Sequence, residues 1–327
     1  MLLFDEIISH PIWERAAMNE IERIERRISL HDMRVLIAVV DAGSMGKAAA
    51  RLATSQPAIS RSVADLESAL GVRLLDRGPH GIAPTPYGRA LVKRSIAVFD
   101  ELAQGVKDIR FLTDPTAGDL RIGASIAVAA GFVSAVIDRL TRRYPRLAFQ
   151  VLATDTTTVF RALADREVDM VVAHVIDPID ESEMQVETLL RDPHVVVVGA
   201  RNALTRRRRL ALSDLADEQW TLPPPDAPYG KVVSEAFQAG GLPVPPAAVT
   251  STLPVRNFLL ATGRFLSMVP RVVLQFPARD HALKSLPIGL PTTVRPLGIV
   301  TLKNRTLSPV AELFAACARK TAKRVET

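Results

Sequence analysis

Apolar side chains recur at helical spacing in three consecutive segments near the beginning of the chain. Positions three and four residues apart lie on one face of a helix, so each segment predicts a helix with one buried side. The apolar positions are Met33, Leu36, Ile37 and Val40 in the first segment, Ala48, Ala49 and Leu52 in the second, and Ile59, Val63, Leu66 and Leu70 in the third. Three short helices around a small shared core are therefore expected.

The breaks between these segments indicate where the second and third helices begin. Ser44 follows Gly43 and is expected to N-cap the second helix, and Ser55 is expected to N-cap the third. Pro57 suits the first turn of the third helix, where no backbone N–H is needed. With a tight turn at residues 53–54, the pair has the pattern of a helix-turn-helix motif.

The polar residues at the start of the third helix lie off its apolar stripe. Gln56, Ser60 and Arg61 provide an amide, a hydroxyl and a guanidinium. These groups read base edges when a helix enters the DNA major groove. An ordinary solvated helix face beside a core hairpin is the alternative.

A basic stretch rich in glycine and proline follows the third helix. Leu74 and Leu75 supply apolar side chains after a glycine break, and Arg77 supplies a basic one. This composition predicts a two-stranded wing whose tip is formed by residues 79–81, including His80.

Five motifs in this region resemble the winged helix-turn-helix of LysR-type transcriptional regulators. They are AAARL, SQPAISR, the pair Leu66-Glu67, LGVRLLDR and PTPYG. The resemblance implies that the Gln-Pro-x-x-Ser-Arg positions meet the operator DNA. The candidate DNA-binding residues are accordingly Ser44, Ser55, Gln56, Pro57, Ser60, Arg61, Arg77 and His80.

Two positions depart from the family's pattern. His80 stands where a basic residue is common at the wing tip, which puts a fixed minor-groove arginine there in doubt. Gly46 stands where a capping or hydroxyl residue is usual, and glycine weakens a helix slightly.

A long helical run, residues 86–113, comes next. Its apolar and small positions alternate in steps of four and three, which is a heptad seam: Leu91, Ser95, Val98, Leu102, Gly105, Ile109 and Leu112. The predicted helix is about 40 Å long. Packing on its own C-terminal region is one alternative, but dimerisation is favoured, because two recognition helices then reach two half-sites. The family resemblance implies the same linker-helix dimer.

Beyond a DPTAG break, short apolar runs alternate with helical segments, which predicts a mostly parallel α/β sheet. This part resembles the effector-binding region of LysR-type regulators, which has the two-lobed fold of periplasmic binding proteins. The whole expected division is an N-terminal arm 1–28, a winged helix-turn-helix 29–85, a linker helix 86–113, a hinge 114–118 and an effector domain 119–327. Within that domain, the likeness implies a first lobe 119–178 plus 297–327, a second lobe 179–296, and chain crossings near Asp177 and Arg295.

Ligands of open α/β sheets bind beyond the carboxyl ends of the strands. The loops expected there nominate Ser125, Ile126, Thr154, Asp155, Thr156, His174, Ala227, Thr252 and Met268 as effector-binding residues. Ser125 and Thr156 begin helices, whose N–H groups favour an anion. Plain helix capping is the alternative for each hydroxyl, and a satisfied strand-end histidine is the alternative for His174. Together these residues favour a small polar or anionic effector.

Charge and composition agree with this interpretation. The chain has 327 residues, a net charge of +6 and a pI near 9.8, which permits nucleic-acid binding without proving it. No segment approaches about 18 uninterrupted apolar residues, so no membrane span is expected. The acidic start MLLFDEIISHP is unlike a signal peptide, and we therefore expect a cytoplasmic protein.

The sequence offers little for catalysis or metal binding. It lacks GxSxG, a phosphate-binding GxxxxGK[ST] and HExxH, and its six histidines are scattered without ligand spacing. The single cysteine, Cys317, has no partner for an intrachain disulfide or a zinc site. No enzymatic activity, metal or cofactor is expected.

The sequence thus predicts a DNA-binding transcriptional regulator controlled by a small molecule. The expected partners are operator DNA, an effector, further copies of the chain as a dimer or tetramer, and RNA polymerase. A sequence-tolerant nucleoid protein without an effector, or an enzyme with an appended DNA-binding module, are the alternatives. Residues 1–28 are either an amphipathic arm or the result of a start codon placed before Met18.

Overall fold

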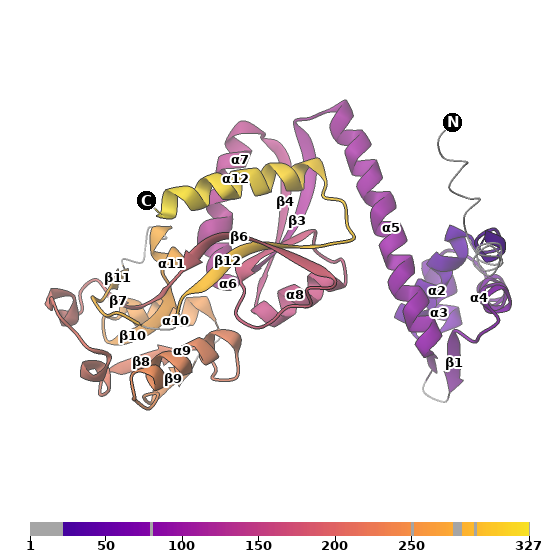
Figure 1. Ribbon diagram of the computed structural model, residues 1–327. Coiled ribbons are helices and arrows are strands. Elements are labelled where there is room, and N and C mark those ends of the chain that lie inside the picture. Colours follow the sequence, from indigo (N-terminus) through magenta and orange to yellow (C-terminus); the bar gives the residue numbers. More distant parts are fainter. Residues whose placement is uncertain (1–21, 79–80, 250–251, 277–282, 291–292, 327) are drawn as a thin grey trace, which may run out of the picture. The chain divides into compact units, whose positions relative to one another are not determined.

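The computed structural model describes residues 22–78, 81–249, 252–276, 283–290 and 293–326 (Figure 1). The chain forms two compact units, Met1–Leu102 and Ala103–Thr327, and the boundary between them falls inside helix α5. In the described part of the chain, no helix is both long and apolar enough to cross a membrane.

The first unit is a three-helix core with a two-stranded wing. Its elements are α2 (Leu30–Ala42), α3 (Met45–Arg51), α4 (Gln56–Leu70), β1 (Leu75–Gly78) and β2 (Gly81–Pro84), and the two strands pair antiparallel. Helices α3 and α4 bury the apolar faces expected of them, with Leu52 and Leu70 only half-buried. On helix α2, Leu36 is buried and Val40 packs half-buried against the core, as expected. Met33 and Ile37 are only half-buried, whereas Val35 and Val39, which were not expected on this face, are buried.

Caps set the ends of these helices. Ser55 accepts a hydrogen bond from the backbone N–H of Ala58 and caps α4. Ser44 occupies the N-cap position of α3, but its side chain makes no capping hydrogen bond. Helix α2 ends at Gly43, whose φ of 63° is a left-handed conformation that suits glycine.

The PTPYG motif joins the wing to the next helix through a close backbone approach. The Thr85 hydroxyl donates to the Arg73 carbonyl and accepts from the Gly88 N–H. A Cβ at Gly88 would lie 2.0 Å from the Leu74 carbonyl oxygen, so only glycine fits there. This junction explains why the motif combines a hydroxyl residue with a glycine three positions later.

Helix α5 spans Pro86–Thr113, the range expected for the linker helix. Five valine, leucine and isoleucine side chains along it are exposed in the single chain: Val98, Leu102, Val106, Ile109 and Leu112. Four of them were expected on the heptad seam, and Val106 was not. Asp114 follows the helix and pairs with Arg146 of β4, so the expected hinge at residues 114–118 is tied to the second unit.

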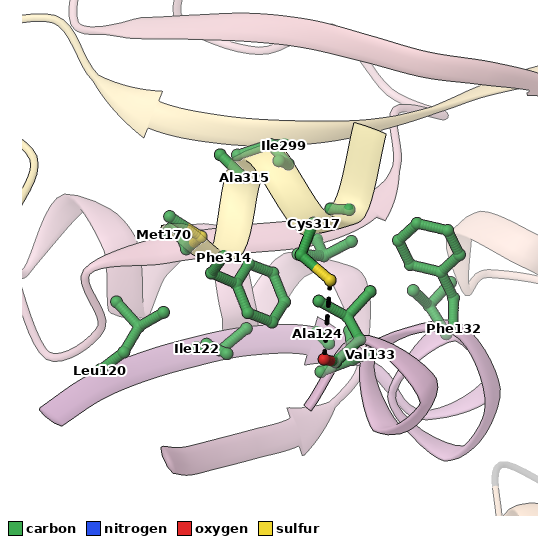
Figure 2. Close-up of a cluster of buried hydrophobic side chains, with 14 of the residues drawn as sticks. Leu120, Ile122, Ala124, Phe132, Val133, Met170, Ile299, Phe314, Ala315 and Cys317 are labelled. Carbon is green, nitrogen blue, oxygen red and sulfur yellow. Dashed lines mark hydrogen bonds between the residues drawn. The ribbon is translucent and has the colours of Figure 1, made fainter. Parts of the chain in front are cut away.

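The second unit contains two mixed sheets. The first has the order β4-β3-β5-β12-β6 and consists of β3 (Ala117–Ser125), β4 (Arg146–Thr154), β5 (Met170–His174), β6 (Met184–Asp192) and β12 (Arg295–Leu302). Helices α7 (Ser134–Arg143) and α12 (Pro309–Glu326) pack on one face, and α8 (Thr156–Ala164) packs on the other. Figure 2 shows Phe314 and Cys317 of α12 pointing toward Ile122 and Ala124 of β3.

The second sheet has the order β11-β7-β10-β8-β9. Its strands are β7 (His194–Gly199), β8 (Gln219–Leu222), β9 (Ala247–Val249), β10 (Phe265–Pro270) and β11 (Leu283–Ser285). The associated helices are α9 (Pro228–Ala239) and α10 (Leu253–Ala261). Trp220 and Phe237 meet edge to face in the core of this lobe, with ring centroids 5.5 Å apart.

Sheet membership corrects the expected lobe boundary. Strand β6 pairs with β12 over its whole length and therefore belongs to the first sheet. The first chain crossing lies at Pro193, between β6 and β7, and not near Asp177. The return crossing falls just before β12 begins at Arg295. The sheets are also mixed rather than mostly parallel, because β12 runs antiparallel to both of its neighbours.

Short elements complete the second unit. They are α6 (Ile126–Val128), a π-helical turn at Ala129–Val133, 3-10 turns at Ala203–Arg206 and Leu212–Leu215, and α11 (Val272–Gln275). The sequence did not predict α11, β6 or β11.

Candidate functional site

The first turns of α4 expose the residues that were expected to read DNA. Gln56, Pro57 and Arg61 are exposed, and Ser60 is half-buried beside the apolar side of the helix. Ile59 and Val63, on the opposite face, are about 1 % exposed and hold the helix against the core. One end of α4 therefore presents an amide and a guanidinium to solvent on a fixed support.

Two carboxylates fix the position of α4. Asp32, which caps α2 together with Ser29, accepts a hydrogen bond from the Ser62 hydroxyl in the middle of α4. Burial alone would raise the pKa of Asp32, but the hydrogen bonds from Ser29 and Ser62 hold it below its usual value. At the other end of the helix, Glu67 Oε1 accepts the backbone N–H groups of Leu74 and, more distantly, Leu75, at 2.7 and 3.3 Å.

The other predicted DNA-binding residues are spread around this helix. Ser44 and Ser55 occupy the N-cap positions of α3 and α4, and Arg77 is exposed on β1 of the wing. His80 lies outside the described residues. Gly46 lies beside the start of α4, because a Cβ there would meet the Gln56 side chain at 3.5 Å.

In the second unit, a cavity of about 130 Å³ opens where strands of both sheets end. Eight of the nine predicted effector-binding residues line it: Ser125, Ile126, Thr154, Asp155, Thr156, Ala227, Thr252 and Met268. The remaining lining residues were not expected: Ala127, Pro223, Pro224, Pro228, Tyr229, Leu253, Arg256 and Pro270. This cavity is called the pocket below.

His174, the ninth residue, is fully buried behind the pocket in a chain of hydrogen bonds. Its Nδ1 lies 2.9 Å from the Tyr229 hydroxyl, and its Nε2 lies 2.8 Å from Asp192 Oδ2. The Tyr229 hydroxyl also lies 3.3 Å from Ser125 Oγ. Asp192 further accepts the backbone N–H of Val272. When Nε2–H of His174 donates to Asp192, Nδ1 accepts a hydrogen bond from the Tyr229 hydroxyl.

This chain connects the two lobes at the chain crossing. Ser125, His174 and Asp192 end strands β3, β5 and β6 of the first sheet, whereas Tyr229 comes from α9 of the second lobe. Burial raises the pKa of Tyr229, so its hydroxyl stays protonated. The neighbouring His194 is also buried, and desolvation lowers its pKa to about 3, so it is neutral.

Two polar groups in the pocket have no partner among the described residues. The hydroxyl of Thr156, a residue only 4 % exposed, makes no hydrogen bond. Nε and Nη2 of Arg256 are also buried without an acceptor. Buried polar groups are normally satisfied, so such exceptions point to a ligand or to ordered water.

Sequence reasoning missed Tyr229 and Arg256 for different reasons. Tyr229 lies in the sequence PPPDAPYG after β8, where the proline-rich loop at a strand end is itself a signal of a binding loop. Arg256 sits within the amphipathic helix α10, and nothing local distinguishes it from a solvated arginine. The described residues contain no cluster of three or more histidine, cysteine, aspartate or glutamate side chains able to hold a metal ion.

Comparison with known proteins gives both units the same assignment. Residues 113–323 match the LysR substrate binding domain, which is more than half of the chain. The protein belongs to the LysR family of transcriptional regulators. Residues 30–89 match the bacterial regulatory helix-turn-helix protein model of the lysR family.

Named relatives extend over most of this LysR-type regulator. It is 27 % identical over 298 residues to the HTH-type transcriptional regulator GbpR of Azospirillum brasilense, covering 90 % of this chain and 87 % of the relative. It is 29 % identical over 287 residues to the SDS degradation transcriptional activation protein of Pseudomonas sp. (strain ATCC 19151), covering 86 % and 93 %.

Solved structures share its fold. A full-length OxyR variant from Pseudomonas aeruginosa superposes with a TM-score of 0.65 at 21 % identity, covering 89 % of this chain and 94 % of that one. Full-length CbnR in complex with its target DNA gives a TM-score of 0.62 at 20 % identity, covering 90 % and 99 %. The chain is thus a DNA-binding transcriptional regulator with a helix-turn-helix module and an effector-binding domain.

Proposed function

We propose that this LysR-type regulator reads a specific operator with the first turns of α4 and changes its activity when a small polar or anionic effector enters the pocket. The observation that carries the proposal is the contrast on α4. Gln56, Pro57 and Arg61 are exposed at one end, whereas the opposite face is locked into the core by Ile59 and Val63. A rigid helix end with hydrogen-bonding side chains fits the major groove.

The wing and the caps of α3 and α4 complete the proposed DNA contacts. Ser44 and Ser55 lie at the helix N-termini, which suit phosphate contacts, and Arg77 of β1 supplies a positive charge. His80 stays part of the proposal as a wing-tip residue. Phosphate contacts of this kind position the protein, while α4 supplies the sequence preference.

Self-association through α5 is a further part of the proposal. Leu102, Val106, Ile109 and Leu112 are 49 to 81 % exposed in the single chain, and they recur at helical spacing along one stretch. A second copy of the helix would bury them and place two α4 helices on one operator. Tetramers, contact with RNA polymerase, and action in the cytoplasm, where the DNA lies, belong to the same proposal.

The pocket favours an effector-controlled regulator over a sequence-tolerant nucleoid protein. A protein that needs no effector has no use for a cavity of about 130 Å³ that contains unsatisfied polar groups. An enzyme with an appended DNA module is disfavoured because His174 and Asp192, the acid–base side chains of the Tyr229–His174–Asp192 chain, are at most 2 % exposed and do not line the pocket. We propose no catalytic residue and no cofactor.

Replacing Arg61 tests the reading of DNA. Arg61→Ala should weaken binding to the DNA upstream of the protein's own coding sequence by about 1–3 kcal/mol, because a bidentate contact to guanine is lost. Gel-shift titrations of the full-length protein on that DNA and on random DNA of equal length measure the difference. The affinity for random DNA should change much less.

An exposed arginine of the second unit provides the control. Arg142→Ala on α7 removes the same charge and should leave both affinities unchanged. Equal losses on specific and random DNA for Arg61→Ala would reduce Arg61 to a phosphate contact and contradict the proposed reading role.

A further inference from the structure

Arg256 is a cation in the pocket without a counter-charge among the described residues. It projects from α10, and its Nε and Nη2 atoms are buried without a hydrogen-bond acceptor. Burial lowers its pKa to about 10, so the guanidinium is still charged at neutral pH. A buried charge without an acceptor destabilises the fold. A ligand that supplies an acceptor for Arg256 would remove this cost.

The first lobe faces Arg256 with groups of a different kind. Asp155 lines the same pocket, but its oxygens already accept the backbone N–H and hydroxyl of Thr158 at 2.9 and 2.6 Å. Asp155 thereby caps α8 with a negative charge, so an anionic group of the effector is repelled from that helix start. An anion in this pocket therefore belongs at Arg256 and not at the N-terminus of α8.

Thr156 supplies the second unsatisfied group of the pocket. Its buried hydroxyl comes from the first lobe, whereas Arg256 comes from the second. A ligand that satisfies both would connect the two lobes.

The remaining walls are mainly apolar and leave little room. Apolar lining residues include Ile126, Pro224, Pro228, Leu253, Met268 and Pro270. The volume of about 130 Å³ is close to that of an apolar cavity of about 150 Å³ that holds a single benzene ring. A compact apolar body fits these walls, whereas a sugar would leave its hydroxyls without partners.

We infer that the effector is a small monocarboxylic acid with a compact apolar body, and that Arg256 is the residue that selects it by pairing with the carboxylate. The inference rests on the proposed function, because it names the ligand class of the same pocket. The fork of a guanidinium matches both oxygens of a carboxylate, and the Thr156 hydroxyl adds one more hydrogen bond. The negative Asp155 disfavours a doubly charged phosphate in the same place.

Matched acids and amides test the ligand class on the full-length protein. Benzoate, cyclohexanecarboxylate and 3-methylbutanoate are each compared with their primary amides, which have the same shape without the charge. Calorimetric titration should show at least one acid binding at least tenfold more tightly than its amide. Phenyl phosphate should bind more weakly than benzoate.

Arg256→Met removes the charge and keeps the length of the side chain. The preferred acid should then lose at least tenfold in affinity and bind no better than its amide. Because the variant no longer buries an unsatisfied cation, its melting temperature without ligand should equal or exceed that of the wild type. Arg264→Met is the control, because Arg264 is exposed in the same lobe outside the pocket and should keep wild-type binding.

Three results would overturn the inference. The first is that none of the acids binds more tightly than its amide, and the second is that Arg256→Met keeps the preference for the acid. The third is that the variant melts well below the wild type, which would make Arg256 a structural residue. If a neutral compound alters the footprint of the protein on operator DNA, the proposed function stands and the inference fails. Failure of the proposed function would be seen separately, because the wild-type protein would then bind specific and random DNA with equal affinity.

Discussion

The helix-turn-helix unit and the pocket of the second unit place their polar side chains in opposite surroundings. On α4, the side chains of Gln56 and Arg61, for which we propose DNA contacts, are exposed to solvent. In the pocket, the Thr156 hydroxyl and part of the Arg256 guanidinium are buried without partners. An exposed arginine costs the fold almost nothing, whereas a buried unsatisfied donor is destabilising until a ligand accepts its hydrogen bonds. The exposed side chains of α4 therefore need only a helix that is held in place by the core. The pocket needs enough stability in the rest of its unit to offset its unsatisfied polar groups.

Each unit is also stabilised internally by a carboxylate, and the two carboxylates differ in their surroundings. In the first unit, half-buried Asp32 joins α2 to α4 through the hydroxyls of Ser29 and Ser62. In the second unit, Asp169 is 4 % exposed and interacts with three cations. Those cations are Lys107 of α5, Arg121 of β3 and Arg305. The carboxylate of the first unit is therefore held by hydroxyls, whereas Asp169 of the second unit is surrounded by cations.

The largest effect should come from neutralising the buried carboxylate. Asp169→Asn keeps the shape of the side chain but leaves the almost completely buried Arg305 facing an amide in place of a carboxylate. Breaking one side of a buried ion cluster costs about 3–5 kcal/mol. Urea denaturation of the full-length protein, followed by hydrogen exchange of peptides from the second unit, should show that loss there and not in α2–α4.

An exposed ion pair on the same lobe serves as the control for Asp169→Asn. Asp138 pairs with Arg142 on α7, and both side chains are more than half exposed. Asp138→Asn should leave the urea midpoint almost unchanged, because exposed pairs contribute little. If both variants lose the same stability, the contrast between the two kinds of carboxylate is wrong.

Low pH should reduce the contribution of Asp169 to the free energy of unfolding. Burial alone would raise the pKa of Asp169, but hydrogen bonds from Arg121 and the charges of Lys107 and Arg305 hold it below its usual value. The unfolded side chain titrates near pH 3.9, so the stabilisation is fully present above about pH 4 and is lost as the pH falls through the folded pKa. The stability difference between wild type and Asp169→Asn should stay constant from about pH 8 to 5 and shrink below about pH 4. A difference that widens on acidification would show that burial outweighs the three cations.

Local patterns predicted the DNA-binding unit better than the pocket. The helical spacing of Ile59, Val63 and Leu66 depends on neighbours in sequence, and these residues are buried as expected. The lobe boundary was wrong because β6 is assigned to its sheet by pairing with β12, a strand about 100 residues further along the chain. No local signal contains that pairing.

The predicted residues that line the pocket lie at strand ends and helix starts, except Met268, which lies within β10. Ser125 is the last residue of β3, and Thr156 begins α8 two residues after β4 ends, so topology alone places both at the strand ends that line the pocket. Arg256 matters because its surroundings bury it, and burial is a property of the folded lobe. His174 shows the reverse case, since its strand-end position was foreseen but its partners, Tyr229 and Asp192, were not.

The smallest effect should come from the hydroxyl contact in the first unit. Ser62→Ala removes the hydrogen bond from α4 to Asp32 and leaves the apolar packing of the helix intact. A hydrogen bond to a charged group contributes about 1.5–3 kcal/mol, and the better helix propensity of alanine returns about 0.5 kcal/mol. A net loss of about 1–2.5 kcal/mol is therefore expected, measured as faster hydrogen exchange in peptides of α2 and α4. Ser68→Ala on the same helix is the control, because Ser68 is exposed and its contact with Arg27 is long, at 3.5 Å. Asp32 keeps its bonds from Ser29 in the Ser62→Ala variant, so α2 should remain capped. A loss as large as that of Asp169→Asn would mean that the first unit, too, depends on a single buried polar contact.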